Sequence, residues 1–196
     1  MRKPDYKKKR PFENEKKYTS ESLLELAEKE LSLKRLEVPS LLFYEFSKRN
    51  EKESNQKLNQ LFIKYKRMPM KWLQKARLLL LDNFLLEDTG RHHIYIIRLD
   101  FSGSKDDKRY PYGIYIGETK RKVEVRLSQH LCKSHKYSVG VVERRGQEGE
   151  ILWSLFTHIA LPKNRKEGKK LEEDVANFLK EASIYGLPEK RIYGGH

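Results

Sequence analysis

HHIYIIRLDF, at residues 92–101, is rich in β-branched and aromatic side chains and predicts a β-strand. A polar stretch follows, and YPYGIYIGE at residues 110–118 predicts a second strand, so the two form a hairpin with a long connection. Residues 122–135 then change to the apolar spacing of a helix. The change from strand to helix periodicity marks the centre of a mixed α and β region.

The rest of the carboxy-terminal half continues this alternation. A turn region is expected around Gly140–Gly149, a β-prone apolar stretch at Ile151–Leu161, and a helix at Glu167–Ala182. Arg191–His196 closes the chain with one more short strand. The order β-β-α-β-α-β predicts a small three-stranded sheet flanked by helices in residues 91–196.

The amino-terminal half reads as helical throughout, so the whole chain is expected to be α+β. Residues 1–18 lack apolar periodicity and predict a basic, flexible arm. Residues 19–88 predict a helical region that binds DNA or forms an interface. Its first helix begins near Ser20 with Ser22 and Glu25 as a capping box, and Glu87–Gly90 is the expected linker.

Two further helices are expected in the helical region. The second begins at Val38-Pro39-Ser40 and runs through Leu41 to Tyr65. The third begins after Pro69 and runs through Trp72 to Leu86. The amino-terminal half therefore predicts three helices.

Charge points to a polyanionic partner. The chain has 42 Lys and Arg against 28 Asp and Glu, which gives a net charge of +14. Residues 1–90 hold 21 Lys and Arg and 14 Asp and Glu, and residues 91–196 hold the same numbers, so each half has a net charge of +7. Nucleic acid is favoured over an anionic membrane, because the sequence shows no lipidation motif and no strongly one-sided apolar helix. No apolar run approaches the ~20 residues that span a bilayer. The single Cys132 excludes an internal disulfide, and a cytoplasmic protein is expected.

A basic stretch in the helical region adds to this expectation. Residues 57–81 hold seven Lys or Arg and no acidic residue. The cations expected to contact nucleic acid there are Lys64, Lys66, Arg67 and Lys71. The interleaved Tyr65 and Trp72 are interpreted as core residues rather than as a stacking surface for bases.

The carboxy-terminal half resembles the GIY-YIG nuclease superfamily, particularly its small restriction-enzyme-like members. The resemblance is carried by HIY at 93–95, YIG at 115–117 and ETKRKVEVRLSQH at 118–130. It implies five catalytic residues: Tyr95, Tyr115, Arg126, His130 and Glu172. Arg126 and His130 are four residues apart, so one helical face offers both to the same spot.

The chain departs from the family pattern at three points. His93 stands in place of the first glycine, and the segment between the two tyrosines is longer than in compact members. The position of the family's late asparagine stays open between Asn177 and His196. Glu172 is preferred to Glu173 for the family's metal-binding glutamate, because it lies nearer the apolar face of its helix.

The implied chemistry is metal-dependent hydrolysis of DNA phosphodiester bonds. Glu172 would bind Mg²⁺ or Mn²⁺, and Arg126 would pair with phosphate oxygens. One tyrosine would act as general base, with His130 relaying a proton or orienting it. Three cations are expected to lower the tyrosine pKa and to contact nucleic acid: Lys120, Arg121 and Lys122.

Two other classes of function remain open. The chain could be a catalytically inactive protein that binds nucleic acid with a GIY-YIG fold, or an interaction protein whose charge only confers solubility. Cleavage could serve restriction, repair or mobile-element processing, and a homodimer is compatible with each. The retention of both tyrosines, Arg126 and a suitable glutamate favours the enzyme.

Overall fold

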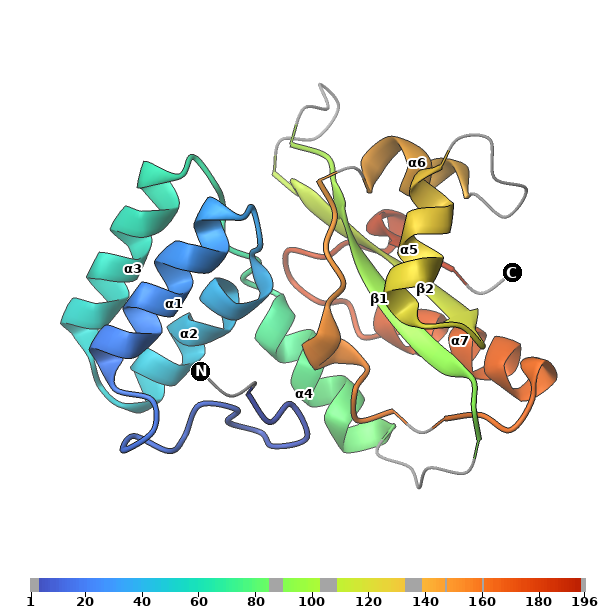
Figure 1. Ribbon diagram of the computed structural model, residues 1–196, viewed down its shortest axis with the longest axis horizontal. Helices are drawn as coiled ribbons and strands as arrows, with labels where there is room; N and C mark the ends of the chain where they lie inside the picture. Colours follow the sequence, from blue (N-terminus) through green and yellow to red (C-terminus); the bar gives the residue numbers. More distant parts are fainter. Residues whose placement is uncertain are drawn as a thin grey trace. The chain divides into compact units, whose positions relative to one another are not determined.

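The structure is a computed structural model in which residues 4–84, 90–102, 109–132, 139–146, 148–159 and 161–194 are described (Figure 1). The chain divides into two compact units, Met1–Gln74 and Lys75–His196. The first is helical and the second combines helices with a sheet, so the α+β class expected from the sequence is confirmed.

Three helices form most of the first unit: α1 (Ser20–Ser32), α2 (Glu37–Lys48) and α3 (Lys52–Lys64). They pack against one another (Figure 1), and apolar side chains fill most of the space between them. These buried side chains include those of Leu23, Ala27, Leu31, Leu36, Leu41, Leu42, Phe46, Leu58 and Phe62. Their spacing of three and four residues explains why each segment is a helix with one buried face.

Two details of these helices correct the sequence interpretation. The cap of α1 is Thr19, whose Oγ1 accepts a hydrogen bond from Ser22 N at 3.3 Å, so the proposed capping box of Ser22 and Glu25 is wrong. The single helix expected up to Tyr65 is instead α2 and α3, because Asn50 adopts the left-handed conformation (φ 58°) between them.

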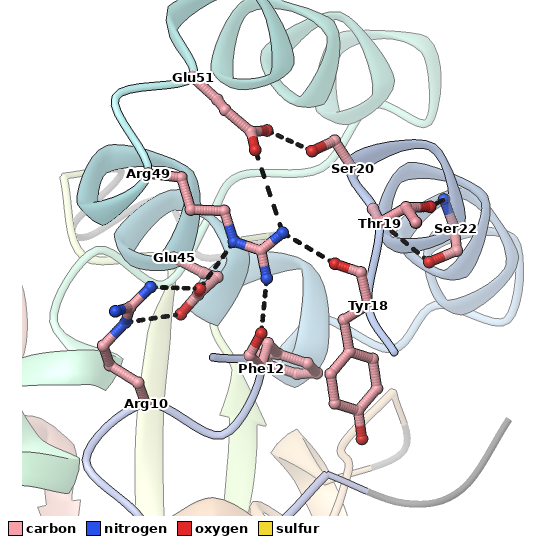
Figure 2. Close-up of polar contacts among 9 residues, drawn as sticks. All are labelled: Arg10, Phe12, Tyr18, Thr19, Ser20, Ser22, Glu45, Arg49 and Glu51. Carbon is pink, nitrogen blue, oxygen red and sulfur yellow. Dashed lines mark hydrogen bonds and ion pairs between the residues drawn. The ribbon is translucent and has the colours of Figure 1, made fainter. Parts of the chain in front are cut away.

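The segment before α1 is not a free arm over its described residues. Phe12 and Tyr18 are buried, and their carbonyl oxygens accept hydrogen bonds from Arg49 Nη2 at 2.6 Å and Nη1 at 2.8 Å. Arg49 Nε also donates to Glu45, and Arg10 pairs with the same carboxylate at 2.8 Å (Figure 2). The buried aromatic rings and this network attach residues 10–18 to α2.

The fourth helix, α4 (Leu73–Asn83), follows Pro69 as expected. Trp72 immediately before it is buried and belongs to the core, as its interpretation required. The expected end at Leu86 and most of the linker Glu87–Gly90 lie outside the described residues.

The sheet of the second unit has the order β1-β2-β3, with β1 (His93–Asp100), β2 (Tyr112–Thr119) and β3 (Ile192–Tyr193). The two strands of the hairpin are antiparallel, and the short closing strand runs parallel to β2. All three lie where strand periodicity predicted them.

The segment at 151–161 does not form the additional strand that its composition suggested. Ile151 makes one antiparallel bridge to Ile97, and a short 3₁₀ helix, η1 (Trp153–Leu155), then begins. The buried apolar residues here are Leu152, Leu155, Phe156 and Ile159. Their spacing of three or four, rather than two, explains the turn away from the sheet.

The remaining elements of this unit are α5 (Val123–Leu131), α6 (Gly140–Arg145), α7 (Arg165–Glu181) and η2 (Glu189–Arg191). The turn expected around residues 140–149 therefore contains a short helix. No helix in the described part of the chain is long and apolar enough to cross a membrane.

Strand alternation sets which residues meet which helix. Tyr95 pairs with Gly117 across the hairpin, so both lie on one face, and His130 of α5 reaches Tyr95 there. Glu118 points to the opposite face, where it lies against Gly168 of α7. The first face therefore contains Tyr95 and His130 of the predicted catalytic motif, whereas Glu172 comes from α7.

Candidate active site

The centre of the site is a buried contact between β1 and α5. Tyr95 Oη and His130 Nε2 share a hydrogen bond at 2.7 Å, and both side chains are fully buried. Tyr95 is held by the hairpin and His130 by the last turn of its helix. A phenol and an imidazole 35 residues apart in sequence are thus brought together, as the motif predicted.

Tyr115 completes a cluster of three rings. Its ring centroid lies 5.3 Å from that of His130 and 6.1 Å from that of Tyr95. The register pairs Tyr115 with Ile97, two residues along the strand from Tyr95, so both phenols share a face. Tyr115 retains 7% exposure whereas Tyr95 has none, so Tyr115 is the less buried of the two tyrosines.

Gly117 makes room for this cluster. A Cβ atom there would overlap the hydroxyl end of the Tyr95 ring and lie 2.9 Å from the Tyr115 ring. The glycine of YIG is therefore required by the close approach of two aromatic rings rather than by an unusual backbone conformation.

Burial controls the protonation of both phenols. It is the main cause that raises the pKa of Tyr95 above its ordinary value, and the neighbouring Tyr115 raises it further, against the opposing charge of Arg126. Burial also raises the pKa of Tyr115, followed by the negative charge of Glu172. Both tyrosines are consequently neutral phenols at neutral pH.

The interaction between the two phenols affects them differently. It raises the pKa of Tyr95 and lowers that of Tyr115. It therefore favours ionisation of Tyr115 over that of Tyr95.

The expected effect of the cations at 120–122 on the tyrosines is wrong. Lys120, Arg121 and Lys122 are exposed in the turn between β2 and α5, and the cation that lowers the tyrosine pKa values is Arg126. Water screens exposed charges, whereas Arg126 is half-buried beside the rings. The net pKa shift of both phenols is upward, the opposite of the expectation.

Arg126 and Glu172 lie at the border of the cluster. Arg126 Nη1 donates to Gln129 Oε1 at 3.5 Å and its side chain hydrogen-bonds to Tyr95. Glu172 is half-buried on α7, and its charge acts on Tyr115. Glu173 is exposed, in agreement with the preference for Glu172. The five predicted residues therefore interact as one group.

The cluster offers a metal ion a single carboxylate, that of Glu172, rather than a set of several protein ligands. Within the described ranges, no group of three or more His, Cys, Asp or Glu side chains is arranged to hold an ion. A half-buried single carboxylate fits Mg²⁺ or Mn²⁺ that keeps water and phosphate oxygens as its other ligands. Glu172 is the residue that would hold such an ion.

The four cations of the first unit that were expected to contact nucleic acid differ in their exposure and in their ion pairs. Lys64 pairs with Glu28 at 2.5 Å, and Arg67 is half-buried. Lys66 and Lys71 are exposed. Tyr65 is half-buried, and its hydroxyl donates to Glu28 at 3.4 Å.

Asn177 and His196 were the two candidates for the position of the family's late asparagine. Asn177 is exposed on α7, and His196 lies outside the described residues.

Sequence reasoning missed the pair formed by His92 and Glu118. His92 Nδ1 contacts Glu118 Oε1 across the open end of the hairpin, and both side chains are nearly buried. The two are 26 residues apart, and neither is one of the five catalytic residues that the resemblance implied. Only the register of the hairpin, which the sequence left open, could have placed them together.

Comparisons with protein-family models, curated proteins and solved structures found no match. The functional argument accordingly rests on the chemistry and geometry of these side chains.

Proposed function

We propose that this chain is a metal-dependent endonuclease that hydrolyses phosphodiester bonds in DNA. The observation that carries the proposal is the buried hydrogen bond of 2.7 Å between Tyr95 and His130, with Tyr115 against both rings. Two phenols and an imidazole beside a guanidinium and a carboxylate can move a proton and neutralise a phosphate. The net charge of +14 supports an anionic substrate.

We assign Tyr115 as the residue that accepts a proton from the attacking water. It is the less buried of the two tyrosines, and its interaction with Tyr95 favours its ionised form. Tyr95 and His130 position it from within the core. This assignment selects one of the two tyrosines that the sequence left equivalent.

The charged residues have separate tasks. Arg126 would place its planar guanidinium against the phosphate and offset the negative charge of the transition state. Glu172 would hold Mg²⁺ or Mn²⁺, which when bound polarises the phosphate and stabilises the leaving oxygen. Its neighbour Glu173 is exposed and is assigned no role.

The test is cleavage of supercoiled plasmid and mixed-sequence genomic DNA with Mg²⁺, with Mn²⁺ and with chelator. The wild type, Glu172→Gln and the matched control Glu173→Gln are compared. We expect metal-dependent cleavage by the wild type and the control, and a loss of at least about 100-fold in Glu172→Gln with DNA binding retained. Discrete bands would indicate sequence-specific, restriction-like cutting.

Equal cleavage by the two glutamine variants would remove Glu172 from the site. Binding without cleavage in every metal, over a broad substrate panel, would favour the inactive nucleic-acid-binding protein instead. Neither cleavage nor salt-dependent binding would leave a protein whose charge serves only solubility.

A further inference from the structure

Exposed cations gather in two segments of the second unit. The first is the turn between β2 and α5, and the second is the beginning of α7. The members of this set, called here the basic rim, are Lys120, Arg121, Lys122, Lys163, Arg165, Lys166, Lys169 and Lys170; every one is exposed. The α7 members were not among the residues that the sequence motif indicated.

A tight contact joins the two segments. Glu118, two residues before Lys120, packs on Gly168, where an added Cβ would lie 2.6 Å from Glu118 Cγ. His92 pairs with the carboxylate of Glu118 and holds it in place. The turn and the first turns of α7 are therefore adjacent surfaces, although more than forty residues separate them in sequence.

The nearby acidic residues do not neutralise the rim. Glu167 faces the helix start, where its Oε2 accepts from Lys163 N at 3.0 Å and its Oε1 from Asn164 Nδ2 at 2.8 Å. Glu118 is paired with His92, and Glu172 acts on Tyr115.

Glu173 and Asp174 stand four residues after Lys169 and Lys170, in the less favourable order for a helical ion pair. Over the described part of the chain, no ion pair within 4.0 Å involves a member of the rim. Eight cations therefore face solvent together.

We propose that the basic rim binds the backbone phosphates of double-stranded DNA beside the candidate active site. The inference rests on the proposed function and specifies how the substrate is held. Flexible, exposed lysines suit contacts to phosphate that position a duplex without reading its sequence. Glu172 stands three residues after Lys169 on α7, a spacing that places the two side chains on neighbouring turns of one helical face, so the rim adjoins the cluster.

The test measures binding without cleavage. Fluorescence anisotropy of a labelled DNA duplex is recorded in chelator over a range of NaCl concentrations. The variant carries Lys166→Gln, Lys169→Gln and Lys170→Gln, because glutamine keeps helix propensity close to that of lysine. The matched control makes the same change at three exposed lysines of the first unit, Lys16, Lys29 and Lys52.

We expect the slope of log affinity against log salt to become shallower by about 2 to 3 in the rim variant. The control should change the slope by much less. Circular dichroism and thermal unfolding check that both variants are folded.

An unchanged salt slope in a folded rim variant would overturn the proposal that the rim binds DNA phosphates, but it would not contradict the proposed nuclease activity. Loss of cleavage in Glu172→Gln, together with the expected shallower salt slope in the rim variant, would support both the nuclease proposal and the rim proposal. Equal weakening by the two triple variants would show an effect of total charge alone and would overturn the assignment to the rim. Preferential binding of an RNA duplex in competition would overturn the choice of DNA.

Discussion

At the residue scale, the protonation of Tyr115 is the property on which the proposed chemistry depends. Burial and the charge of Glu172 raise its pKa, so only a small ionised fraction exists at neutral pH. At pH values below the pKa, that ionised fraction grows about tenfold for each unit by which the pH rises. The catalytic rate should follow it if Tyr115 is the base.

We therefore expect the single-turnover rate of DNA cleavage to rise between about pH 7 and 9. Tyr115→Phe should lower the rate by at least about 100-fold, because a phenyl ring accepts no proton. The control is Tyr185→Phe, at a tyrosine that is 84% exposed. A rate that stays flat with pH, or a Tyr115→Phe enzyme with full activity, would contradict the assignment.

Gly117 offers a second prediction at this scale. Gly117→Ala should destabilise the fold by about 1–3 kcal/mol, because its methyl group would overlap the Tyr95 ring. The free energy of unfolding in urea measures this change. Gly140→Ala is the control, since its Cβ would meet only the end of the Arg144 side chain, at 3.2 Å. Equal stabilities of the two variants would show that the ring moves aside at little cost.

At the scale of elements, the attachment of residues 10–18 to α2 depends on Arg49. Its side chain is 3% exposed and bonds to two carbonyl oxygens, while its Nε lies 2.8 Å from Glu45, which is itself buried (Figure 2). The segment resembles an arm in composition, yet its two aromatic rings are covered. The buried ion pair of Arg49 and Glu45 therefore helps to attach residues 10–18 to α2.

Arg49→Met should lower the free energy of unfolding by about 3–5 kcal/mol, because the buried Glu45 would lose its buried partner and keep only the half-buried Arg10. Arg35→Met is the control: its pair with Glu30 spans 3.8 Å and its side chain is 59% exposed, so the loss should stay below about 1 kcal/mol. Chemical denaturation of both variants gives the comparison. Similar small losses would mean that apolar packing alone holds the segment.

At the scale of the whole molecule, acid should weaken the fold through His158. This histidine is 3% exposed, and burial together with the positive charge of Arg77 lowers its pKa from 6.5 to about 4. The unfolded chain takes up a proton near pH 6.5 and the folded chain only near pH 4. Stability is therefore complete above the first value and declines as the pH falls toward the second.

The expected loss over that interval is about 3 kcal/mol. It should be absent in His158→Leu, which carries no titratable group at the site. Denaturation in urea at pH 7, 6, 5 and 4 measures both proteins. Parallel curves for the two would show that another group causes any acid sensitivity.

The sequence by itself determined the elements whose signals are local. Runs of β-branched and aromatic residues at 93–100 and 112–119 form strands that are buried on both faces. Apolar spacings of three and four form the helices, because that pattern creates one buried face. The spacing of Arg126 and His130 likewise places both on adjacent turns of α5. These features depend on neighbours within one or two turns of chain.

Only the tertiary structure decided what distant residues do to one another. Burial raised the tyrosine pKa values against the expectation from nearby lysines, since desolvation depends on packing from all sides. Arg49 captured a segment more than thirty residues away, and Glu118 met both His92 and Gly168. Such contacts arise from register and packing, because no local pattern specifies which side chain fills a given space.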